Sequence, residues 1–341
     1  MNKKLNVLAA LVGLTGLAGI ASAQSTVTLY GRVDIGVSYT NNGTSINPGA
    51  SSSKGQWSMQ QGTASRFGLK GEEDLGGGMY ARFNIENRFF ADTGAQDSAA
   101  LFKGLSIVAV GSKTAGELYL GRDVVPAYYI TCTADPTCWS YTSQPGQPYA
   151  YANYNGSVAA DNSGIRRNNT IGYRSPKISG VSTELAYAFG EGTRRPVRGF
   201  NVQYNQGPVY AGVGLDDGGS DDNGNKSRLW IVGGGYDFGF VRPLVTYSDA
   251  KGGPTSPVGY AAKSASLVLV MPTPVGRVFV GAGHLKANAG FGTSDVKSTK
   301  ILAGADYNLS KRTALYANVG SAKTDDKTRS NAFDVGITHK F

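Results

Sequence analysis

Histidine, cysteine and charged residues are all scarce in this sequence. Its 341 residues include two histidines and two cysteines, and 17% of the residues are charged. An ordinary α/β enzyme has more leucine and more charge. His284 and His339 lie on distant predicted strands without an evident serine partner, so the nucleophile and base that acyl transfer requires are not apparent. We therefore predict no enzyme activity, no catalytic residue, no metal site and no cofactor.

Phosphate-binding loops and nucleic-acid-binding modules are also missing. The glycine clusters at 76–78 and 233–235 lack the strand-to-helix context of a phosphate-binding loop, so we interpret them as turn and strand glycines. The net charge of +9 alone is poor support for binding to nucleic acid. We therefore expect no nucleic-acid partner.

Beyond residue 23 the sequence has no long apolar run. The preceding segment has two lysines at its start, an apolar run over 5–20 and Ala-Ser-Ala at 21–23, which has the form of a cleavage site. That run is too short and too rich in glycine for a stable transmembrane helix of about 20 apolar residues. We predict that 1–23 is a cleaved signal peptide, with a retained membrane anchor as the alternative. The mature chain, 24–341, would have 31 basic residues, because two lysines are removed, and 24 acidic residues, a net charge of +7.

Strict alternation of apolar and polar residues takes the place of apolar runs. In the segment 27–39, one face of a strand would carry Val27, Leu29 and Val33, while the other would carry Arg32 and Asp34. Strands of soluble proteins average about five or six residues. At about 3.3 Å per residue, a strand of this length spans a bilayer even when it is tilted.

The same pattern recurs along the chain and predicts sixteen strands. They are expected at 27–39, 64–74, 79–90, 104–111, 117–122, 166–175, 181–189, 199–206, 208–216, 227–237, 241–249, 259–272, 276–288, 296–308, 312–323 and 332–341. Long connections, such as 41–63 and 123–165, alternate with short ones, such as 76–78 and 273–275. Short periplasmic turns and long extracellular loops are the plan of bacterial outer-membrane barrels. We therefore predict an all-β fold, a 16-stranded antiparallel transmembrane β-barrel.

Such a barrel must enclose water. Every backbone N–H and C=O in hydrocarbon has to be paired internally, so the strands must close on themselves. Eight strands would fill the interior with side chains, whereas sixteen leave an aqueous lumen. The charged faces of the predicted strands, which would be costly to bury in an apolar core, then face that water. By the same parity argument we expect His284 to face the lumen.

Three segments and the last residue resemble the general diffusion porins of Gram-negative bacteria, particularly those of β-proteobacteria. They are 27–34 (Val-Thr-Leu-Tyr-Gly-Arg-Val-Asp), 65–78 (Ser-Arg-Phe-Gly-Leu-Lys-Gly-Glu-Glu-Asp-Leu-Gly-Gly-Gly), 118–122 (Leu-Tyr-Leu-Gly-Arg) and Phe341. The resemblance covers nearly the whole mature chain. It implies a homotrimer in the outer membrane, in contact with lipid and lipopolysaccharide, whose third loop folds into the lumen as a constriction. It also implies passive diffusion of small hydrophilic solutes and ions, and recognition of Phe341 by the barrel-assembly machinery.

The resemblance also places basic residues of the wall at the constriction. The matching positions are Arg32, Arg66, Arg122 and Arg166, with Lys70 and Arg82 as secondary residues of the lumen. Parity places three of the four inside, but Arg122 has the parity of outward leucines unless the strand bulges there. Arg167 has outward parity, so we prefer Arg166. The carboxylates expected to offset the repulsion among the arginines are Asp34, Glu72, Glu86, Asp123 and Asp135.

The third loop, 123–165, has no acidic run and is rich in tyrosine. Together with the positive net charge, this favours a preference for anions, although the excess lysine and arginine could instead lie on loops. Cys132 and Cys138 are expected to form a disulfide in an oxidising compartment, with metal binding as the weaker alternative. A channel specific for a sugar or organic acid, and an outer-membrane receptor or adhesin, remain the alternatives to a general channel.

Overall fold

The computed structural model describes residues 26–41, 55–138, 140, 165–192, 196–219, 226–252, 260–288, 295–325 and 328–341. The predicted signal peptide and much of the predicted loops 41–63 and 123–165 lie outside these residues. Strands β1 to β6 and helix α2 are β1 (Thr26–Asn41), β2 (Gln56–Gln60), β3 (Ser65–Gly76), β4 (Met79–Phe89), β5 (Leu105–Ser112), β6 (Gly116–Val124) and α2 (Pro126–Ala134). The remaining strands are β7 (Arg166–Arg174), β8 (Val181–Ala188), β9 (Val197–Gln206), β10 (Val209–Gly219), β11 (Lys226–Tyr236), β12 (Arg242–Gly252), β13 (Tyr260–Thr273), β14 (Gly276–Ala287), β15 (Val296–Asn308), β16 (Thr313–Thr324) and β17 (Ser330–Lys340).

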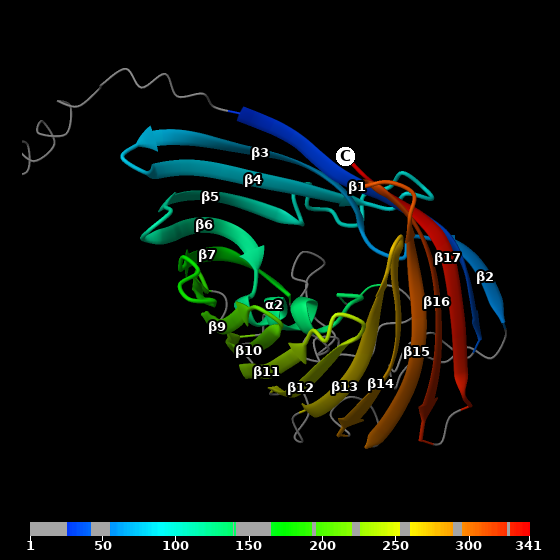
Figure 1. Ribbon diagram of the computed structural model, residues 1–341. Coiled ribbons are helices and arrows are strands. Elements are labelled where there is room, and N and C mark those ends of the chain that lie inside the picture. Colours follow the sequence, from blue (N-terminus) through cyan, green and yellow to red (C-terminus); the bar gives the residue numbers. More distant parts are fainter. Residues whose placement is uncertain are drawn as a thin grey trace, which may run out of the picture.

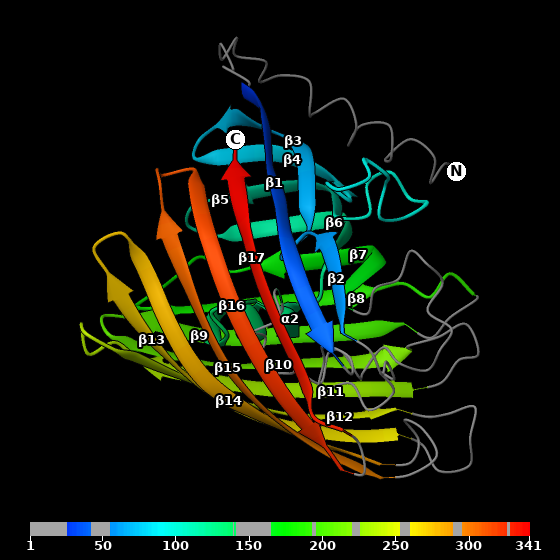
Figure 2. The same cartoon turned by 90° about the vertical axis from the view of Figure 1, so that its right-hand side faces the viewer.

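All the described strands form one closed antiparallel sheet around α2 (Figure 1). From β3 onward each strand pairs with the next along the chain, and β1 closes the barrel against β17, as Figure 2 shows from the side. The C-terminal part of β1 pairs with β2, and its N-terminal part pairs with β3. Strands β2 and β3 are therefore two halves of one barrel strand. The seventeen described strands therefore occupy sixteen positions in the barrel, which confirms the predicted fold. The prediction was wrong in treating all of 41–63 as a loop, because β2 lies within it.

The outer surface of the barrel is apolar and its polar side chains point inward. On β1, Val27, Leu29 and Val33 are exposed, whereas Asp34 and Ser38 are fully buried. Aromatic pairs lie near both ends of the strands, with Trp230 against Tyr247 at the long-loop end and the Tyr236, Phe238 and Phe240 rings at the short-turn end. An apolar band between two aromatic belts is the outer surface that a lipid bilayer requires. The described part of the chain contains no helix with the length and apolarity that a membrane crossing requires.

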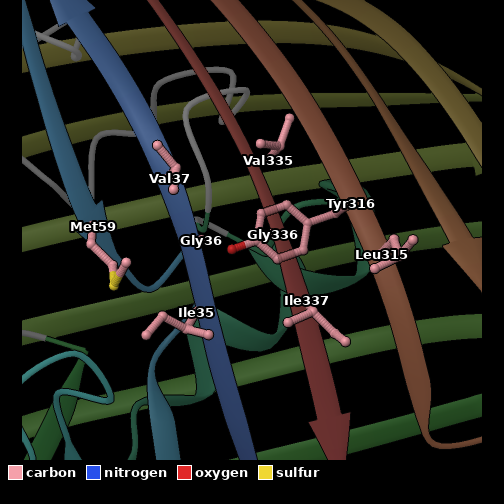
Figure 3. Close-up of a pocket in the computed structure, with 9 residues that line it drawn as sticks. All are labelled: Ile35, Gly36, Val37, Met59, Leu315, Tyr316, Val335, Gly336 and Ile337. Atoms are coloured by element: carbon pink, nitrogen blue, oxygen red, sulfur yellow. The ribbon is translucent and has the colours of Figure 1, made fainter.

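The seam that closes the barrel depends on two facing glycines. Gly36 of β1 lies opposite Gly336 of β17. The ring of Tyr316, from β16, lies against both glycines, where any added Cβ would overlap it. The Tyr316 hydroxyl donates a 3.0 Å hydrogen bond to Asp34. On the outer face, these glycines are part of an apolar groove of about 570 Å³, which is bordered by β1, β2, β16 and β17 (Figure 3).

Candidate constriction of the barrel lumen

Small residues on the inner wall of the barrel allow helix α2 to lie inside it. Its buried residues recur at helical spacing as Ala127, Ile130, Thr131 and Ala134, which form one face. That face packs against β9, β10 and β11. The wall positions beneath the helix are glycines, and a Cβ at Gly233 would lie 2.8 Å from the Cβ of Ala134. Glycine on the inward face therefore allows the helix to pack directly on the strands.

The chain then crosses the lumen to the opposite wall. Beyond α2, the carbonyl of Pro136 accepts a 2.9 Å hydrogen bond from Arg277 of β14. The hydroxyl of Ser140 lies 3.0 Å from that of Thr63, between β2 and β3. In a sixteen-position barrel, the strand pair β2/β3 lies nearly opposite β10. Residues 126–138 and Ser140 thus narrow the lumen, which confirms the predicted infolded loop. The sequence did not predict the helix within it.

A row of cationic side chains lies on the wall that faces this segment. The register places Lys340 opposite Arg32, Arg32 opposite Arg66, and Arg66 opposite Arg88, on four adjacent barrel strands. Directly opposite residues have Cβ atoms about 5 Å apart, and like charges at such positions destabilise a sheet. Sequence matching selected Arg32 and Arg66 but not Arg88 or Lys340, because the register that aligns them cannot be obtained from a single strand.

A buried carboxylate is ion-paired with this cationic row. Glu86 is 3% exposed and lies 3.6 Å from Arg66 and 3.2 Å from Arg88. Arg32 donates a 3.1 Å hydrogen bond to the hydroxyl of Thr63. Of the carboxylates predicted as counter-charges, Glu86 is therefore ion-paired with two arginines of the row.

A β-bulge changes the parity at the top of β6. The register shifts between Gly121 and Asp123, and Gly121 has a φ of +126°, which favours glycine. Arg122 is buried there and donates hydrogen bonds to the carbonyl of Lys103, at 2.8 Å, and to the side chain of Asn168. The structure thus contains the bulge that an inward Arg122 would require.

Both arginines at the start of β7 are largely buried. Arg166 donates a 2.7 Å hydrogen bond to the carbonyl of Gly104, next to the cationic row. Arg167, which parity assigned to the outward face, instead forms a 3.1 Å ion pair with the buried Asp216 of β10. The parity argument was wrong for Arg167, because strict alternation does not hold beside a bulge.

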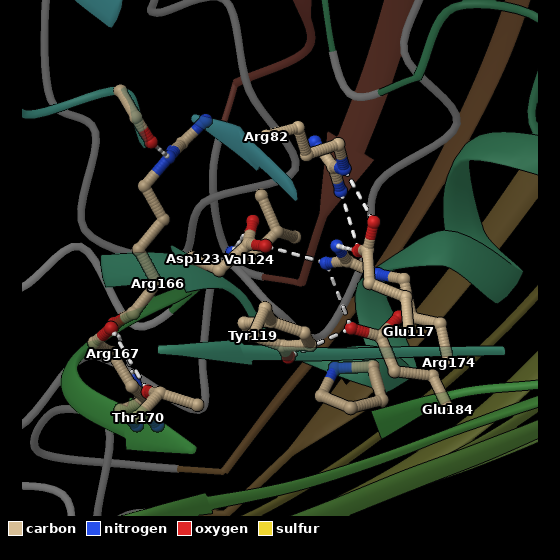
Figure 4. Close-up of polar contacts among 12 residues, drawn as sticks. Arg82, Glu117, Tyr119, Asp123, Val124, Arg166, Arg167, Thr170, Arg174 and Glu184 are labelled. Atoms are coloured by element: carbon tan, nitrogen blue, oxygen red, sulfur yellow. Dashed lines mark hydrogen bonds and ion pairs between the residues drawn. The ribbon is translucent and has the colours of Figure 1, made fainter. Parts of the chain in front are cut away.

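A second cluster contains a central arginine and three carboxylates (Figure 4). Arg174 lies 3.1 Å from Glu117, 2.5 Å from Asp123 and 3.0 Å from Glu184. The guanidinium of Arg174 also lies 4.1 Å from the ring centroid of Tyr119, a cation–π geometry. Arg82 is ion-paired with Glu117. Sequence reasoning named Arg82 and Asp123 but missed the other members, which the pairing of β6, β7 and β8 brings together.

The other predicted residues form separate contacts. The ammonium of Lys70 lies 5.5 Å from the ring centroid of Tyr30, and Glu72 lies opposite Arg82 in the register. Asp34 accepts hydrogen bonds from the backbone N–H of Gly62, at 2.7 Å, and of Thr63, at 3.3 Å. Asp135 accepts a 2.8 Å hydrogen bond from the hydroxyl of Thr137 and so stabilises the turn after α2. The structure also joins Cys132 and Cys138 by a disulfide, which confirms their pairing.

Two tyrosines of α2 face the two charged clusters. Burial raises the pKa of the Tyr128 phenol, while Arg166 and Arg88 lower it. Burial and then Asp123 raise the pKa of Tyr129, which lies near the Arg174 cluster. Both phenols therefore stay neutral at physiological pH, so the net charge of the lumen comes from arginine, lysine and carboxylate side chains.

The net charge of the side chains that face the lumen differs between the two clusters on the wall. The row and its neighbours contribute six cations, Lys340, Arg32, Arg66, Arg88, Arg122 and Arg166, against the carboxylates Glu86 and Asp34. The second cluster has two arginines and three carboxylates, which nearly neutralise one another. Within the described residues, no group of three or more His, Cys, Asp or Glu side chains could hold a metal ion.

Comparison with known proteins identifies the family of this chain. The profile of the family described as Gram-negative porin matches residues 7–327. Outer membrane porin protein 32 of Delftia acidovorans is 35% identical, with 96% of this chain and 91% of that protein aligned. An outer membrane porin protein of Bordetella pertussis is 28% identical over the whole of both chains.

Solved structures have the same fold. The anion-selective porin from Comamonas acidovorans superposes with a TM-score of 0.79 and 28% identity, covering 93% of this chain and all of that one. OmpF of Salmonella typhi superposes with a TM-score of 0.67 at 16% identity, covering 92% of this chain and 97% of that one, and supports the fold alone. A closed sixteen-position barrel, an infolded segment and the match over most of the chain agree, and the chain belongs to the Gram-negative porin family of outer-membrane proteins.

Proposed function

We propose that this protein is an outer-membrane channel through which small hydrophilic solutes and ions diffuse passively, with a preference for anions. The cationic row opposite the infolded segment carries this proposal. Its guanidinium groups stay charged at any relevant pH, and Glu86, the carboxylate that is ion-paired with the row, is shared by two arginines. Such a field raises the local concentration of anions and lowers that of cations. The structural similarity to an anion-selective porin supports the same preference.

The residues proposed to form the basic side of the constriction are Arg32, Arg66, Arg88, Arg122 and Arg166, and Lys70 and Arg82 are secondary. Glu86 offsets the row, and Asp123 belongs to the second cluster. The channel chemistry needs neither a nucleophile nor a cofactor, so no catalytic role is proposed for any residue.

Three further proposals concern maturation and assembly. Residues 1–23 are removed, so N-terminal sequencing of the outer-membrane protein should begin at Gln24. Phe341 pairs with Gly31 through two backbone hydrogen bonds, of 3.0 and 3.2 Å, and its exposed ring suits recognition by the assembly machinery. The resemblance to trimeric porins supports a homotrimer, which chemical cross-linking of intact membranes would detect.

Liposome swelling tests the channel directly. Proteoliposomes should swell at rates that fall smoothly with solute size, and faster for anionic than for cationic solutes of similar size. A single solute admitted out of order of size would instead indicate a specific channel. Absence of swelling with every solute would contradict an open channel and would favour a receptor or adhesin.

A further inference from the structure

The barrel strand formed by β2 and β3 is interrupted where it passes the cationic row. On β1, Gly36 pairs with Gln60, the last residue of β2, and Arg32 pairs with Arg66 of β3. The five residues 61–65 therefore lie opposite the three residues of β1 between these two pairs. The two extra residues leave the regular ladder, and an interruption of this kind turns a side chain in a new direction.

Buried side chains hold the interruption in one conformation. The fully buried carboxylate of Asp34 accepts hydrogen bonds from the backbone N–H groups of Gly62 and Thr63, and the Tyr316 hydroxyl donates to the same oxygen from β16. The hydroxyl of Ser65 donates a 3.1 Å hydrogen bond to the carbonyl of Asp34 and accepts a 3.0 Å one from its backbone N–H. Buried polar groups that are satisfied in this way favour a single backbone conformation.

In this conformation the hydroxyl of Thr63 contacts both sides of the constriction. It accepts a 3.1 Å hydrogen bond from Arg32 of the cationic row and a 3.0 Å one from Ser140 of the infolded segment. A hydroxyl oxygen has two acceptor sites, so Thr63 can accept both bonds at once. Because Thr63 is only 8% exposed, water competes little for these bonds. One uncharged side chain thus joins the arginine of the wall to the segment that crosses the lumen.

We propose that Thr63 is a positioning residue of the channel, which holds the Arg32 guanidinium toward the ion path and fixes the infolded segment at Ser140. The inference rests on the proposed function, because it takes the cationic row as the basic side of the constriction. Arg32 has a cation opposite it on each side, Arg66 and Lys340. Repulsion from these two neighbours favours conformations in which the guanidinium leaves the row, and the bond to Thr63 opposes this movement. The hydroxyl therefore strengthens the preference for anions without adding charge.

Removal of the hydroxyl at constant charge tests the proposal. Thr63→Val keeps nearly the same shape and removes both hydrogen bonds, whereas Thr63→Ser keeps a hydroxyl. If the guanidinium of Arg32 moves from about 5 Å to about 8 Å from a passing ion, the ratio of anion to cation permeability should fall roughly two- to threefold. Thr63→Ser should retain the ratio of the unmodified protein. The reversal potential in a planar bilayer under a KCl gradient measures this ratio. Thr63→Ala removes the same hydroxyl and should lower the ratio equally, which keeps the test available if Thr63→Val does not fold.

A second background separates positioning of Arg32 from a general disturbance of the barrel. In the Arg32→Gln protein, which lacks the guanidinium, adding Thr63→Val should change the ratio no further, because the hydroxyl acts through Arg32. Thr246→Val is the matched control. It removes another buried threonine hydroxyl, which is bonded to Ser266 at 2.6 Å between β12 and β13, and it should leave the ratio unchanged. Ser140→Ala removes the contact with the infolded segment alone, so it should raise the current noise of the open channel and keep the ratio.

The outcomes that overturn the proposal are distinct from a failure of the channel itself. An unchanged ratio in folded Thr63→Val would show that the hydroxyl does not position Arg32. An equal fall in the ratio with and without Arg32→Gln would show that the hydroxyl acts by another route. Unchanged noise in Ser140→Ala would remove the role in fixing the segment. If the proposed function were wrong, the unmodified protein would instead show no conductance, or a preference for cations.

Discussion

Neutralising Arg66 should reduce the preference for anions by a predictable factor. Arg66 lies in the middle of the cationic row, and its side chain is 25% exposed. An anion that passes about 5 Å from a guanidinium in water gains about 0.8 kcal/mol, and screening at 0.1 M salt reduces this to about 0.5 kcal/mol. A cation loses the same amount, so Arg66→Gln should lower the ratio of anion to cation permeability by roughly fivefold.

Neutralising the buried carboxylate Glu86 should have the opposite effect on the ratio of anion to cation permeability. Glu86→Gln leaves both neighbouring arginines in place and removes one negative charge, so the permeability ratio should rise by a similar factor of about five. Lys311→Gln, on an exposed turn, serves as the control and should leave the ratio unchanged. The assay is the reversal potential in a planar bilayer under a KCl gradient. An unchanged ratio in Arg66→Gln, or a shift of the same sign in both variants, would refute the reasoning.

Three other predictions concern the infolded segment and its support. Gly233→Ala places a Cβ 2.8 Å from a side-chain carbon of α2 and should raise current noise or conductance, whereas Gly234→Ala, with 3.6 Å to its nearest atom, should leave single-channel recordings unchanged. Replacing Cys132 and Cys138 by Ser should lower the stability of the loop by about 2 kcal/mol in the chain-entropy model, measured as faster proteolysis of the folded protein. Arg174→Gln leaves three carboxylates without their shared cation and should lower the unfolding temperature in detergent, by an amount equivalent to about 3–5 kcal/mol. If the Gly233, cysteine or Arg174 variant behaved as the unmodified protein does, the contact that it removes or disturbs would not have the role given to it here.

Strand positions were predictable because alternation over ten or more residues is a strong signal. All sixteen predicted strands overlap strands of the barrel, and Val27, Leu29 and Val33 lie on the outer face as expected. Strand β2 was missed because its five residues are too few to establish a period. Parity failed for Arg167 because the β6 bulge and the loop start interrupt the alternation. The parity argument also failed for His284, which is exposed on the outer face and bonds to Thr299 at 2.9 Å, because the small residues beside it do not show which face of the strand is turned to the lipid and which to the lumen.

Contacts between strands were not predictable from a single sequence. Arg88 lies opposite Arg66 only because of the register between β3 and β4. The cluster around Arg174 similarly depends on three strands meeting at one level. The packing of α2 depends on inward glycines of β9 to β11, and in the sequence these resemble ordinary strand glycines. Which side chains meet therefore depends on strand register and long-range packing, and local sequence patterns do not contain this information.

The sign of the reversal potential for the unmodified protein is the most direct test of the central claim. The purified protein in a planar bilayer should give steady single-channel currents, since its lumen is open to water. Under a KCl gradient, the reversal potential should have the sign of chloride permeation, because the cationic row dominates the wall opposite the infolded segment. Steady currents that reverse with the sign of potassium permeation would contradict the assignment of this row as the constriction.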